Sequence, residues 1–314
     1  MYSVHFYGQM LADAIRMGAY ASALRRAVKP DSVVMDLGCG VGVFALLACK
    51  LGARRVYAVE PENIVSLARE VAAANGFSDR IEFFEKLSTE ITLPEPATII
   101  IADLRGVLPW FERNIPSIID ARERLLAPGG VLIPERDVLW ASVVEAPEQY
   151  KEIVGPWGNQ FALDLAAGRR LVTNTWRKSR KKPEQLLTDP ACWTTLDYYA
   201  VNNPDIHAEV SLRAARTGTA HGIAVWFDSE LAEGIRFSNH PAAPETIYGT
   251  GFFPFSDPVE VAEGDRITVQ LAADLVNDGY VWRWETEIPG KASFKQSTFF
   301  GVPLSTNQLR KSAQ

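Results

Sequence analysis

The chain has 314 residues, a length that is comfortable for two domains and long for one. With 47% hydrophobic and 22% charged residues, its composition is that of a globular protein rather than a disordered one. Its formal net charge of −6 gives no overall basic footprint for nucleic-acid binding, and no apolar run approaches the roughly 18 residues that a membrane-spanning helix needs.

The cysteines and histidines are few and scattered. Three cysteines, Cys39, Cys49 and Cys192, and four histidines lack the spacing of a disulfide framework or a metal site. We therefore predict no metal, and we expect all three cysteines to fill buried apolar positions. The chain also shows no secretory signal, so we expect a cytoplasmic protein with neither nucleic acid nor membrane among its partners.

A helix is predicted from about Gln9 to Ala27, because apolar residues recur there at helical spacing before Pro30. Arg16 lies inside this helix, with apolar residues on nearly every side. A charge in such a place needs a partner, unless its side chain extends to water. Both interpretations of Arg16 are open at this point.

The stretch Val33–Gly42, with the sequence VVMDLGCGVG, combines a short apolar run, Asp36 and three glycines spaced two apart. This pattern is typical of a buried parallel strand that turns sharply into a helix. Gly38 and Gly40 allow positive φ and place no Cβ between the backbone and a bound ligand. A second apolar strand ends in Glu60, where an acid is well placed to accept both hydroxyls of a ribose. The sequence therefore predicts a nucleotide-type pocket at the carboxyl ends of these strands.

Strands and helices alternate through the first part of the chain. Further strands are predicted at 81–84, 98–103 and 131–133, and helices at 62–75 and 115–126. This alternation predicts a parallel, doubly wound sheet. After Pro134 the apolar and polar residues alternate with period two, as in an antiparallel barrel or sandwich. We predict a domain boundary near Ile133-Pro134, which divides the chain into residues 1–133 and 134–314.

Between about Pro156 and Leu187 the sequence predicts irregular chain, which includes the basic run Arg177–Lys182. A nucleic-acid patch is one interpretation of this run. Because the run is short and has no interleaved aromatic residues, we favour a solvated loop.

A second informative stretch follows the strand at 98–103. Asp103 ends this strand at the same edge of the sheet as Glu60, and Glu112 follows after a span that contains Gly106 and Pro109. Gly and Pro can turn the chain back, so we predict that the two carboxylates converge on one cavity. They would suit a cation with several N–H donors, such as a guanidinium, or would orient a nitrogen lone pair toward a methyl group.

The pattern D-x-G-x-G-x-G at Asp36–Gly42, followed by Glu60, resembles the first motif and the acidic position of class I S-adenosylmethionine-dependent methyltransferases. Together with the helix at 9–16, the loop Asp103–Glu112 and the boundary Ile133-Pro134, it makes nearly the whole chain similar to the protein arginine N-methyltransferases, as a divergent bacterial relative. The resemblance implies an α/β fold: a Rossmann-like domain followed by an antiparallel β-barrel substrate domain. An arm near 158–185 would make a homodimer.

The resemblance also implies roles for individual residues. Arg16 would pair with the carboxylate of the cofactor, Glu60 would bind its ribose and Tyr7 would close over it. Asp103 and Glu112 would be the catalytic acids of the substrate loop. The full set of residues implied to hold S-adenosyl-L-methionine is Tyr7, Arg16, Asp36, Gly38, Gly40, Glu60, Ser88 and Thr89.

Some positions depart from the family's pattern. The first acid of the loop is Asp103 rather than Glu, which shortens its reach by one methylene. Ile247 and Tyr248 stand where the family usually has His and Trp, so a histidine that braces an acid is missing, and Tyr248 becomes a candidate for substrate binding. Arg105 lies between the two acids. It would neutralise Asp103, bind a carboxylate of the substrate, or point outward and be silent.

We predict methyl transfer from S-adenosyl-L-methionine to a guanidino or amine nitrogen of a peptide or small molecule, with Glu112 as the principal carboxylate. The alternative is a small-molecule methyltransferase of secondary metabolism that acts on a non-guanidine acceptor, which the missing histidine and Arg105 favour. A third interpretation is a non-catalytic module that binds the cofactor, and the intact Asp36, Glu60 and Arg16 argue against it.

Overall fold

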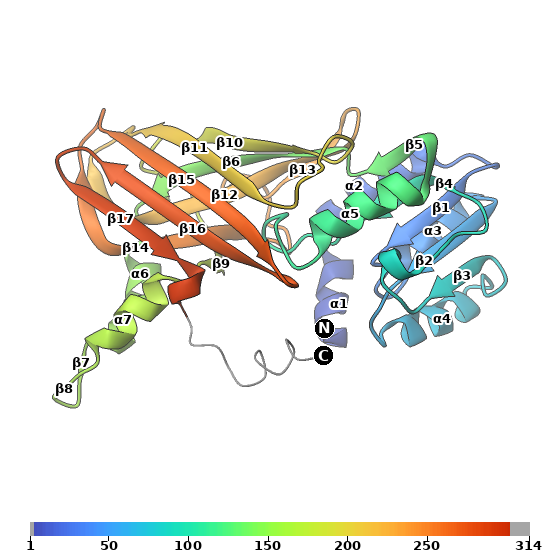
Figure 1. Cartoon of the computed structure of the whole chain (residues 1–314), viewed down its shortest axis with the longest axis horizontal. Coiled ribbons are helices and arrows are strands. Elements are labelled where there is room, and N and C mark those ends of the chain that lie inside the picture. Colours follow the sequence, from blue (N-terminus) through green and yellow to red (C-terminus); the bar gives the residue numbers. More distant parts are fainter. Residues whose placement is uncertain (1–2, 302–314) are drawn as a thin grey trace.

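The computed structural model describes residues 3–301 and has two parts that lie end to end along the long axis of the molecule (Figure 1). One part is a parallel sheet with helices on its faces, and the other is built of long antiparallel strands (Figure 1). The first helix, α1 (Val4–Ala12), lies near the junction of the two parts (Figure 1). This arrangement confirms the predicted Rossmann-like domain followed by an antiparallel β-barrel.

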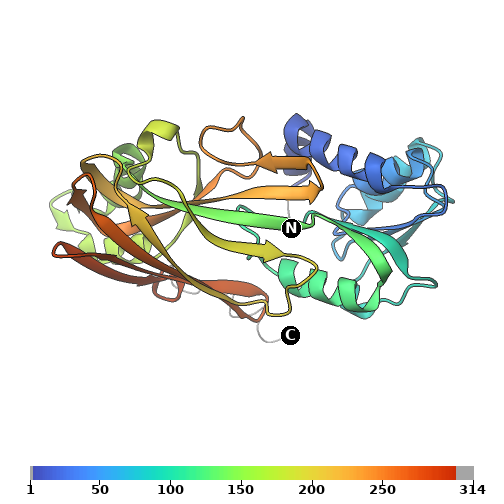
Figure 2. The ribbon, with the colours of Figure 1, turned by 90° about the horizontal axis from the view of Figure 1, so that it is seen from above.

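The parallel sheet has the strand order β3-β2-β1-β4-β5. The central strand β1 is covered on both faces, since all five of its residues are buried. Helices α2 and α3 lie together on one face and α5 on the other (Figure 2). The bounds are β1 (Val33–Leu37), β2 (Arg55–Val59), β3 (Ile81–Phe84), β4 (Ala97–Ala102) and β5 (Leu126–Ile133), with α2 (Ala14–Ala27), α3 (Val43–Lys50), α4 (Val65–Ala74), the short η1 (Ser88–Glu90) and α5 (Asn114–Arg124).

The strand order reverses between β1 and β4, which pair in parallel with Val34 opposite Ile99 and Leu37 opposite Ala102. Ligands of open α/β sheets bind in the crevice outside the carboxyl ends of the strands at such a switch point. Gly38 follows β1 and Asp103 follows β4, so the fold places these two residues side by side at this crevice.

The single helix predicted from Gln9 to Ala27 is wrong, because the structure divides this region into α1 and α2 at Asp13. Asp13 has φ −71° and ψ 88°, and its Oδ1 accepts a hydrogen bond of 3.0 Å from the amide of Arg16. Aspartate is among the preferred N-cap residues, and this cap outweighs the continuous apolar spacing on which the prediction rested.

The antiparallel part consists of two sheets that enclose an aromatic core, in which Trp282, Trp284 and Phe253 are fully buried. One sheet has the order β10-β6-β12-β14-β9, with β13 on β12, and the other has the order β11-β15-β16-β17. The bounds are β6 (Arg136–Val144), β10 (Ala191–Asp197), β11 (Ile206–Arg213), β12 (Gly218–Ala232), β13 (Ile235–Ser238), β14 (Thr250–Val261), β15 (Arg266–Val276), β16 (Gly279–Ile288), β17 (Ala292–Ser297) and the turn η4 (Thr298–Phe300).

A helical arm projects from the antiparallel part after β6 (Figure 1). It contains α6 (Pro147–Val154), η2 (Gly155–Trp157), a hairpin of β7 (Asn159–Gln160) and β8 (Leu163–Asp164), and α7 (Ala166–Thr173). The irregular chain predicted between Pro156 and Leu187 is therefore wrong. Within it, Arg177–Ser179 forms β9 on the edge of β14, and η3 (Pro183–Gln185) follows. Local propensity does not favour a strand in this basic segment. The segment forms one because it makes hydrogen bonds with β14, which is distant in the sequence.

Two smaller expectations are also corrected. Cys39 and Cys49 are buried, but Cys192 is exposed because its place on β10 faces outward. The basic run is not entirely solvated either, since Lys181 is 5% exposed. Within residues 3–301, no helix is long and apolar enough to cross a membrane, and no group of His, Cys, Asp or Glu is arranged to hold a metal ion.

Candidate active site

The glycine loop between β1 and α3 has left-handed backbone at Gly38 (φ 70°), Gly40 (φ 51°) and Gly42 (φ 77°). A Cβ on Gly38 would lie 2.0 Å from Cδ2 of Leu104, and a Cβ on Gly40 would lie 2.7 Å from Cε1 of Tyr7. The loop therefore requires glycine for two reasons, its backbone conformation and the close approach of neighbouring side chains.

Asp36, on the strand that precedes the glycine loop, fixes the position of this loop. The residue is 1% exposed, and its Oδ2 accepts a hydrogen bond of 2.9 Å from the amide of Ala45 in the first turn of α3. Burial raises the pKa of Asp36 to about 7, against the lowering effect of the Ala45 amide, and the nearby charge of Glu60 raises it further. Asp36 thus holds the start of α3 against the end of β1.

Glu60, directly after β2, completes this side of the crevice. Its Oε2 accepts a hydrogen bond of 3.0 Å from the amide of Gly40, and its Oε1 accepts one of 3.0 Å from the amide of Glu62. Burial raises the pKa of Glu60, and these two amides oppose the shift. The glycine loop and Glu60 are therefore one hydrogen-bonded unit, in which each carboxylate oxygen keeps a lone pair for a further donor.

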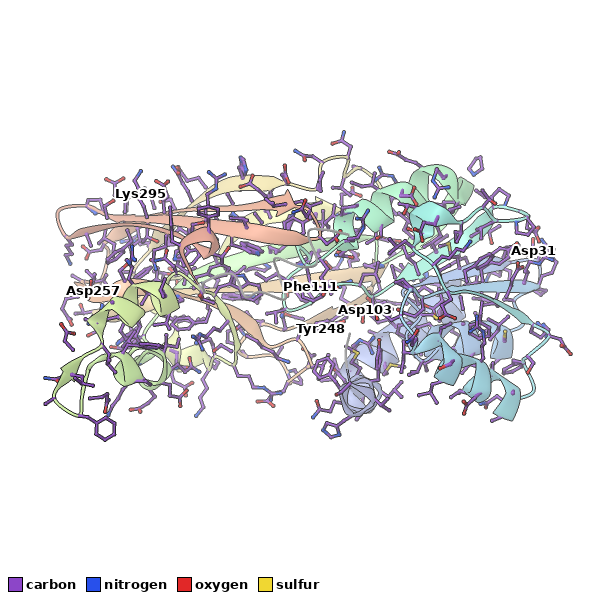
Figure 3. The ribbon with its side chains drawn as sticks, turned by 60° about the horizontal axis from the view of Figure 1, so that its bottom comes forward. Asp31, Asp103, Phe111, Tyr248, Asp257 and Lys295 are labelled. Atoms are coloured by element: carbon purple, nitrogen blue, oxygen red, sulfur yellow. The ribbon has the colours of Figure 1, made fainter. Side chains whose placement is uncertain are left out.

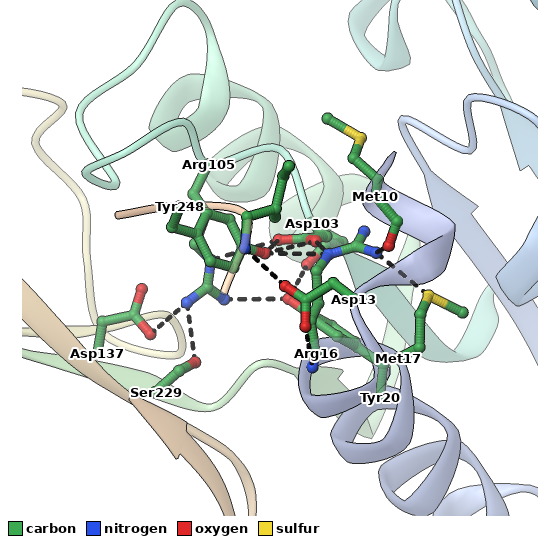
Figure 4. A network of polar contacts seen from close by, with 12 residues as sticks. Met10, Asp13, Arg16, Met17, Tyr20, Asp103, Arg105, Asp137, Ser229 and Tyr248 are labelled. Atoms are coloured by element: carbon green, nitrogen blue, oxygen red, sulfur yellow. Dashed lines mark hydrogen bonds and ion pairs between the residues drawn. The ribbon is translucent and has the colours of Figure 1, made fainter. Parts of the chain in front are cut away.

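Arg16, Asp103 and Tyr248 form a buried cluster that joins α2, the end of β4 and the antiparallel part (Figure 4). Nε of Arg16 lies 2.5 Å from Oδ2 of Asp103, and the Tyr248 hydroxyl lies 2.7 Å from both carboxylate oxygens. The side chains of Arg16 and Asp103 are 8% and 6% exposed. The expectation that Arg16 needs a partner is confirmed, and its partner is Asp103.

Arg105 extends this cluster into the antiparallel part (Figure 4). Its Nη1 donates hydrogen bonds of 2.7 Å to Oδ1 of Asp137 and 2.8 Å to the Ser229 hydroxyl, and its Nε lies 3.5 Å from Oδ1 of Asp103. The side chain is only 1% exposed, so the interpretation that Arg105 points outward is wrong. Asp137 and Ser229, which come from β6 and β12, were not found from the sequence, because they are 32 and 124 residues away and carry no local signal.

The charges of this cluster balance, with Arg16 and Arg105 opposed by Asp103 and Asp137. Burial alone would raise the pKa of Asp103, but Arg16, Arg105 and the hydroxyl of Tyr248 lower it overall. Asp103 is therefore a carboxylate at neutral pH. Arg105 lies near Asp103 as well, but its terminal nitrogens are bound to Asp137, Ser229 and Tyr20.

Glu112 lies in a different environment from the buried Asp103. It is exposed, has φ 44°, and makes no hydrogen bond or ion pair with Asp103 within residues 3–301. The loop between the two acids does fold back, because the Phe111 ring packs on Gly106, where an added Cβ would lie 2.8 Å from it. Phe111, Asp103 and Tyr248 lie between the two parts of the molecule (Figure 3). The convergence of the two carboxylates on one cavity stays a prediction.

Three features of the crevice fit a nucleoside that carries a charged amino-acid tail. The backbone of Gly38 and Gly40 forms a glycine cradle without Cβ atoms, over which the side chains of Leu104 and Tyr7 lie. The hydroxyl of Ser88 is buried without a hydrogen-bond partner in the described part of the chain, whereas Thr89 beside it is exposed. Within the described residues, Arg16 donates its hydrogen bonds from Nε and Nη1. Its Nη2 is therefore left to bind a carboxylate.

Comparisons with known proteins agree with this geometry. The family described as the arginine methyltransferase oligomerization subdomain matches residues 135–278, and the ribosomal protein L11 methyltransferase family matches residues 20–134. The chain is 27% identical to protein arginine N-methyltransferase 1 of Dictyostelium discoideum, over 84% of this chain and 80% of that protein. It is 31% identical to the mouse protein arginine N-methyltransferase 2, over 82% of this chain and 62% of that protein.

A solved structure shares the fold over nearly the whole chain. The Trypanosoma brucei PRMT1 enzyme-prozyme heterotetrameric complex with AdoHcy has a TM-score of 0.86 and 24% sequence identity, over 95% of this chain and 98% of that one. The glycine loop with Glu60, the two family matches and the similar relatives agree on one class of enzyme. The chain is an S-adenosylmethionine-dependent methyltransferase that resembles the protein arginine N-methyltransferases.

Proposed function

We propose that this enzyme transfers the methyl group of S-adenosyl-L-methionine to a guanidino or amine nitrogen of a peptide or small molecule. The observation that carries the proposal is the position of Asp103: an ionised carboxylate at the end of β4, followed by Leu104, whose side chain packs on Gly38 of the glycine loop. The similarity to arginine methyltransferases does not favour the alternative of a non-guanidine acceptor.

The cofactor is proposed to lie along the crevice from Arg16 to Ser88. Nη2 of Arg16 would bind its carboxylate, Gly38 and Gly40 would line its methionine moiety, and Glu60 would accept the ribose hydroxyls. Ser88 and Thr89 would lie near the adenine, and Tyr7, whose ring already packs on Gly40, would cover the site. When bound, S-adenosyl-L-methionine supplies an activated methyl group on its sulfonium.

Glu112 is proposed to bind and orient the acceptor nitrogen. Its carboxylate is open to water and has no partner within residues 3–301, so it can accept an N–H of the acceptor without first breaking an ion pair. The nitrogen loses a proton as it gains the methyl group, and Glu112 can take that proton or pass it to water. Orientation of this kind accounts for most of what such a reaction needs from its enzyme.

Asp103 is proposed to assist Glu112 in orienting the acceptor nitrogen, while it stays bound to Arg16 and Tyr248. Arg105, which contacts Asp137 and lies next to Asp103, is assigned as a positioning residue. A substrate-binding role for Arg105 would require a second conformation, since its guanidinium is already hydrogen-bonded on both terminal nitrogens.

We also propose that the enzyme works as a cytoplasmic homodimer through its arm. The hairpin of the arm exposes large apolar side chains, with Phe161 96% and Leu163 61% exposed, and single chains rarely present such a tip without a partner. The matched oligomerization subdomain includes this arm. A dimer measured by analytical ultracentrifugation that dissociates in a Phe161→Asp variant would support the proposal.

An acceptor screen tests the proposed reaction. Purified enzyme with methyl-labelled S-adenosyl-L-methionine is offered an arginine-containing peptide, free arginine, a primary amine and a phenol. We expect label in a guanidino or amine compound and none in the phenol. Transfer only to the phenol would overturn the proposed nitrogen acceptor while leaving the methyltransferase assignment intact.

Gly40→Ala should weaken cofactor binding at least tenfold, because the new Cβ would occupy the cradle and collide with the Tyr7 ring. Gly52→Ala is the matched control, since Gly52 has φ 94° with open space around it. Both variants strain a left-handed backbone at a cost of about 1–2 kcal/mol, but only one changes the cradle. Calorimetric titration with the cofactor measures the difference, and equal affinities in the two variants would contradict the proposed position of the cofactor.

A further inference from the structure

Residues 180–182 of the basic segment form one wall of a cavity that the reaction proposed above does not use. β9 pairs with β14, and the chain then turns so that residues 180–182 face the loop between β13 and β14. The cavity has a volume of about 140 Å³. Its lining includes Arg180, Lys181, Lys182, His240, Glu245 and Thr246.

The lining of this cavity carries an excess of positive charge. Three of its residues are cationic, and its one carboxylate, Glu245, is already paired with Arg180. Lys181 is 5% exposed and donates hydrogen bonds to two neutral acceptors, the Ser179 hydroxyl at 2.7 Å and the side-chain oxygen of Gln149. No carboxylate pairs with Lys181 in the part of the chain that the structure describes.

The environment of Lys181 indicates that the cavity lacks a negatively charged group. Burial lowers the pKa of Lys181 to about 7, although its ammonium lies 3.8 Å from the centre of the Phe252 ring. A buried ammonium without a counter-ion is costly.

The cavity adjoins the active site through three consecutive residues. Thr246 lines the cavity, and Tyr248 donates a hydrogen bond of 2.7 Å to Asp103 (Figure 4). Between them, the amide of Ile247 donates a hydrogen bond of 2.7 Å to Asp13, and its carbonyl accepts one from Lys178. A single chain segment therefore separates the cationic cavity from the buried carboxylate.

We propose that this cavity binds an oxyanion, a carboxylate or phosphate group, between Lys181 and Arg180. The group belongs either to the methyl acceptor itself or to a separate small anion, and the first source rests on the proposed function. The cavity is large enough, since a water needs only roughly 10–15 Å³ of such volume. Substrates selected here would carry an acidic group as well as a nitrogen to be methylated.

Calorimetric titration with sulfate, without cofactor or acceptor, tests the cavity directly. Sulfate keeps its charge between pH 6 and 9, so any pH dependence comes from the protein. We expect saturable binding that weakens as pH rises through about 7, because Lys181 loses its proton. Lys181→Met should weaken binding at least tenfold and remove this pH dependence, and Arg180→Gln should weaken it several-fold.

Lys295→Gln is the matched control, because Lys295 is an exposed lysine on β17 that, within the described residues 3–301, forms an ion pair only with Glu285. It should bind sulfate as the wild type does. Absence of saturable sulfate binding, or equal affinity in the Lys181→Met and Lys295→Gln variants, would overturn the proposal. If Lys181→Met does not fold, the exposed Arg180→Gln variant decides the matter.

Kinetics then distinguish the two sources of the anion. If the acceptor carries it, Lys181→Met raises KM for acidic acceptors alone, and sulfate competes with those acceptors. If a separate anion occupies the cavity, sulfate changes kcat/KM for every acceptor in the wild type and for none in Lys181→Met. If the protein binds sulfate through Lys181 but transfers no methyl group, the proposed anion site is supported and only the proposed function is overturned.

Discussion

Glu112→Gln should reduce methyl transfer by at least about 10²–10³-fold while the affinity for S-adenosyl-L-methionine stays unchanged. Removing one preorganised hydrogen-bonding group that is aimed at the reacting atoms costs about this much in other enzymes. Glu112 is exposed and has no partner among residues 3–301, so its amide isostere should not disturb the fold. Turnover with labelled cofactor and calorimetric titration of the cofactor give the two quantities separately.

The matched control for this prediction is Glu123→Gln. Glu123 is an exposed glutamate on α5, in the element that follows the acidic loop, and its side chain is 61% exposed beside Arg122. It should retain wild-type turnover. If Glu112→Gln retained turnover as well, the assignment of Glu112 as the principal carboxylate would be wrong, whatever the cofactor affinity.

Arg105→Met should lower the free energy of unfolding by about 3–5 kcal/mol, the usual cost of breaking a buried ion pair from one side. The substitution leaves the carboxylates of Asp103 and Asp137 without the guanidinium that lies between them. Methyl transfer should fall with it, because Asp103 loses one of the charges that orient it. Urea unfolding followed by fluorescence measures the first effect, and kcat measures the second.

Two variants separate the ion pair from the volume of the side chain. Arg105→Met combined with Asp137→Asn should recover part of the lost stability, because the unpaired charge of Asp137 is then removed while Asp103 keeps its pair with Arg16. Arg113→Met breaks an exposed pair with Asp278, with side chains 40% and 75% exposed, and should change stability by less than about 1 kcal/mol. Equal losses for Arg105→Met and Arg113→Met would refute the structural role of the cluster.

The features that could be predicted from the sequence are those that depend on local rules. Asp36, Gly38 and Gly40 lie within a few residues of one another, and the turn that they make requires left-handed backbone at fixed positions. Glu60 could be placed because a strand-end acid in a parallel sheet always faces the same edge. The alternation of strands and helices, followed by residues that alternate with period two, was sufficient to predict the two-part architecture.

Predictions failed where tertiary contacts override local propensity. The apolar spacing of 9–27 predicted one helix, but Asp13 caps a second one, and its other carboxylate oxygen binds the amide of Ile247. The basic run 177–182 was expected to be solvated. Instead, pairing with β14 orders its first half and turns Lys181 inward. Neither contact has a signal in the sequence around it.

The sequence by itself determined the type of fold, the glycine cradle and the candidate acids, because short-range backbone geometry and hydrophobic periodicity encode them. It also indicated that Arg16 needs a partner. Only the tertiary structure decided that this partner is Asp103, that Arg105 is neutralised by Asp137, and that Lys181 faces a cavity without a counter-ion. The physical reason is that charge pairing in a protein interior depends on which side chains are brought within a few ångströms. Packing of the two domains makes that choice between residues up to 232 positions apart, as for Arg16 and Tyr248.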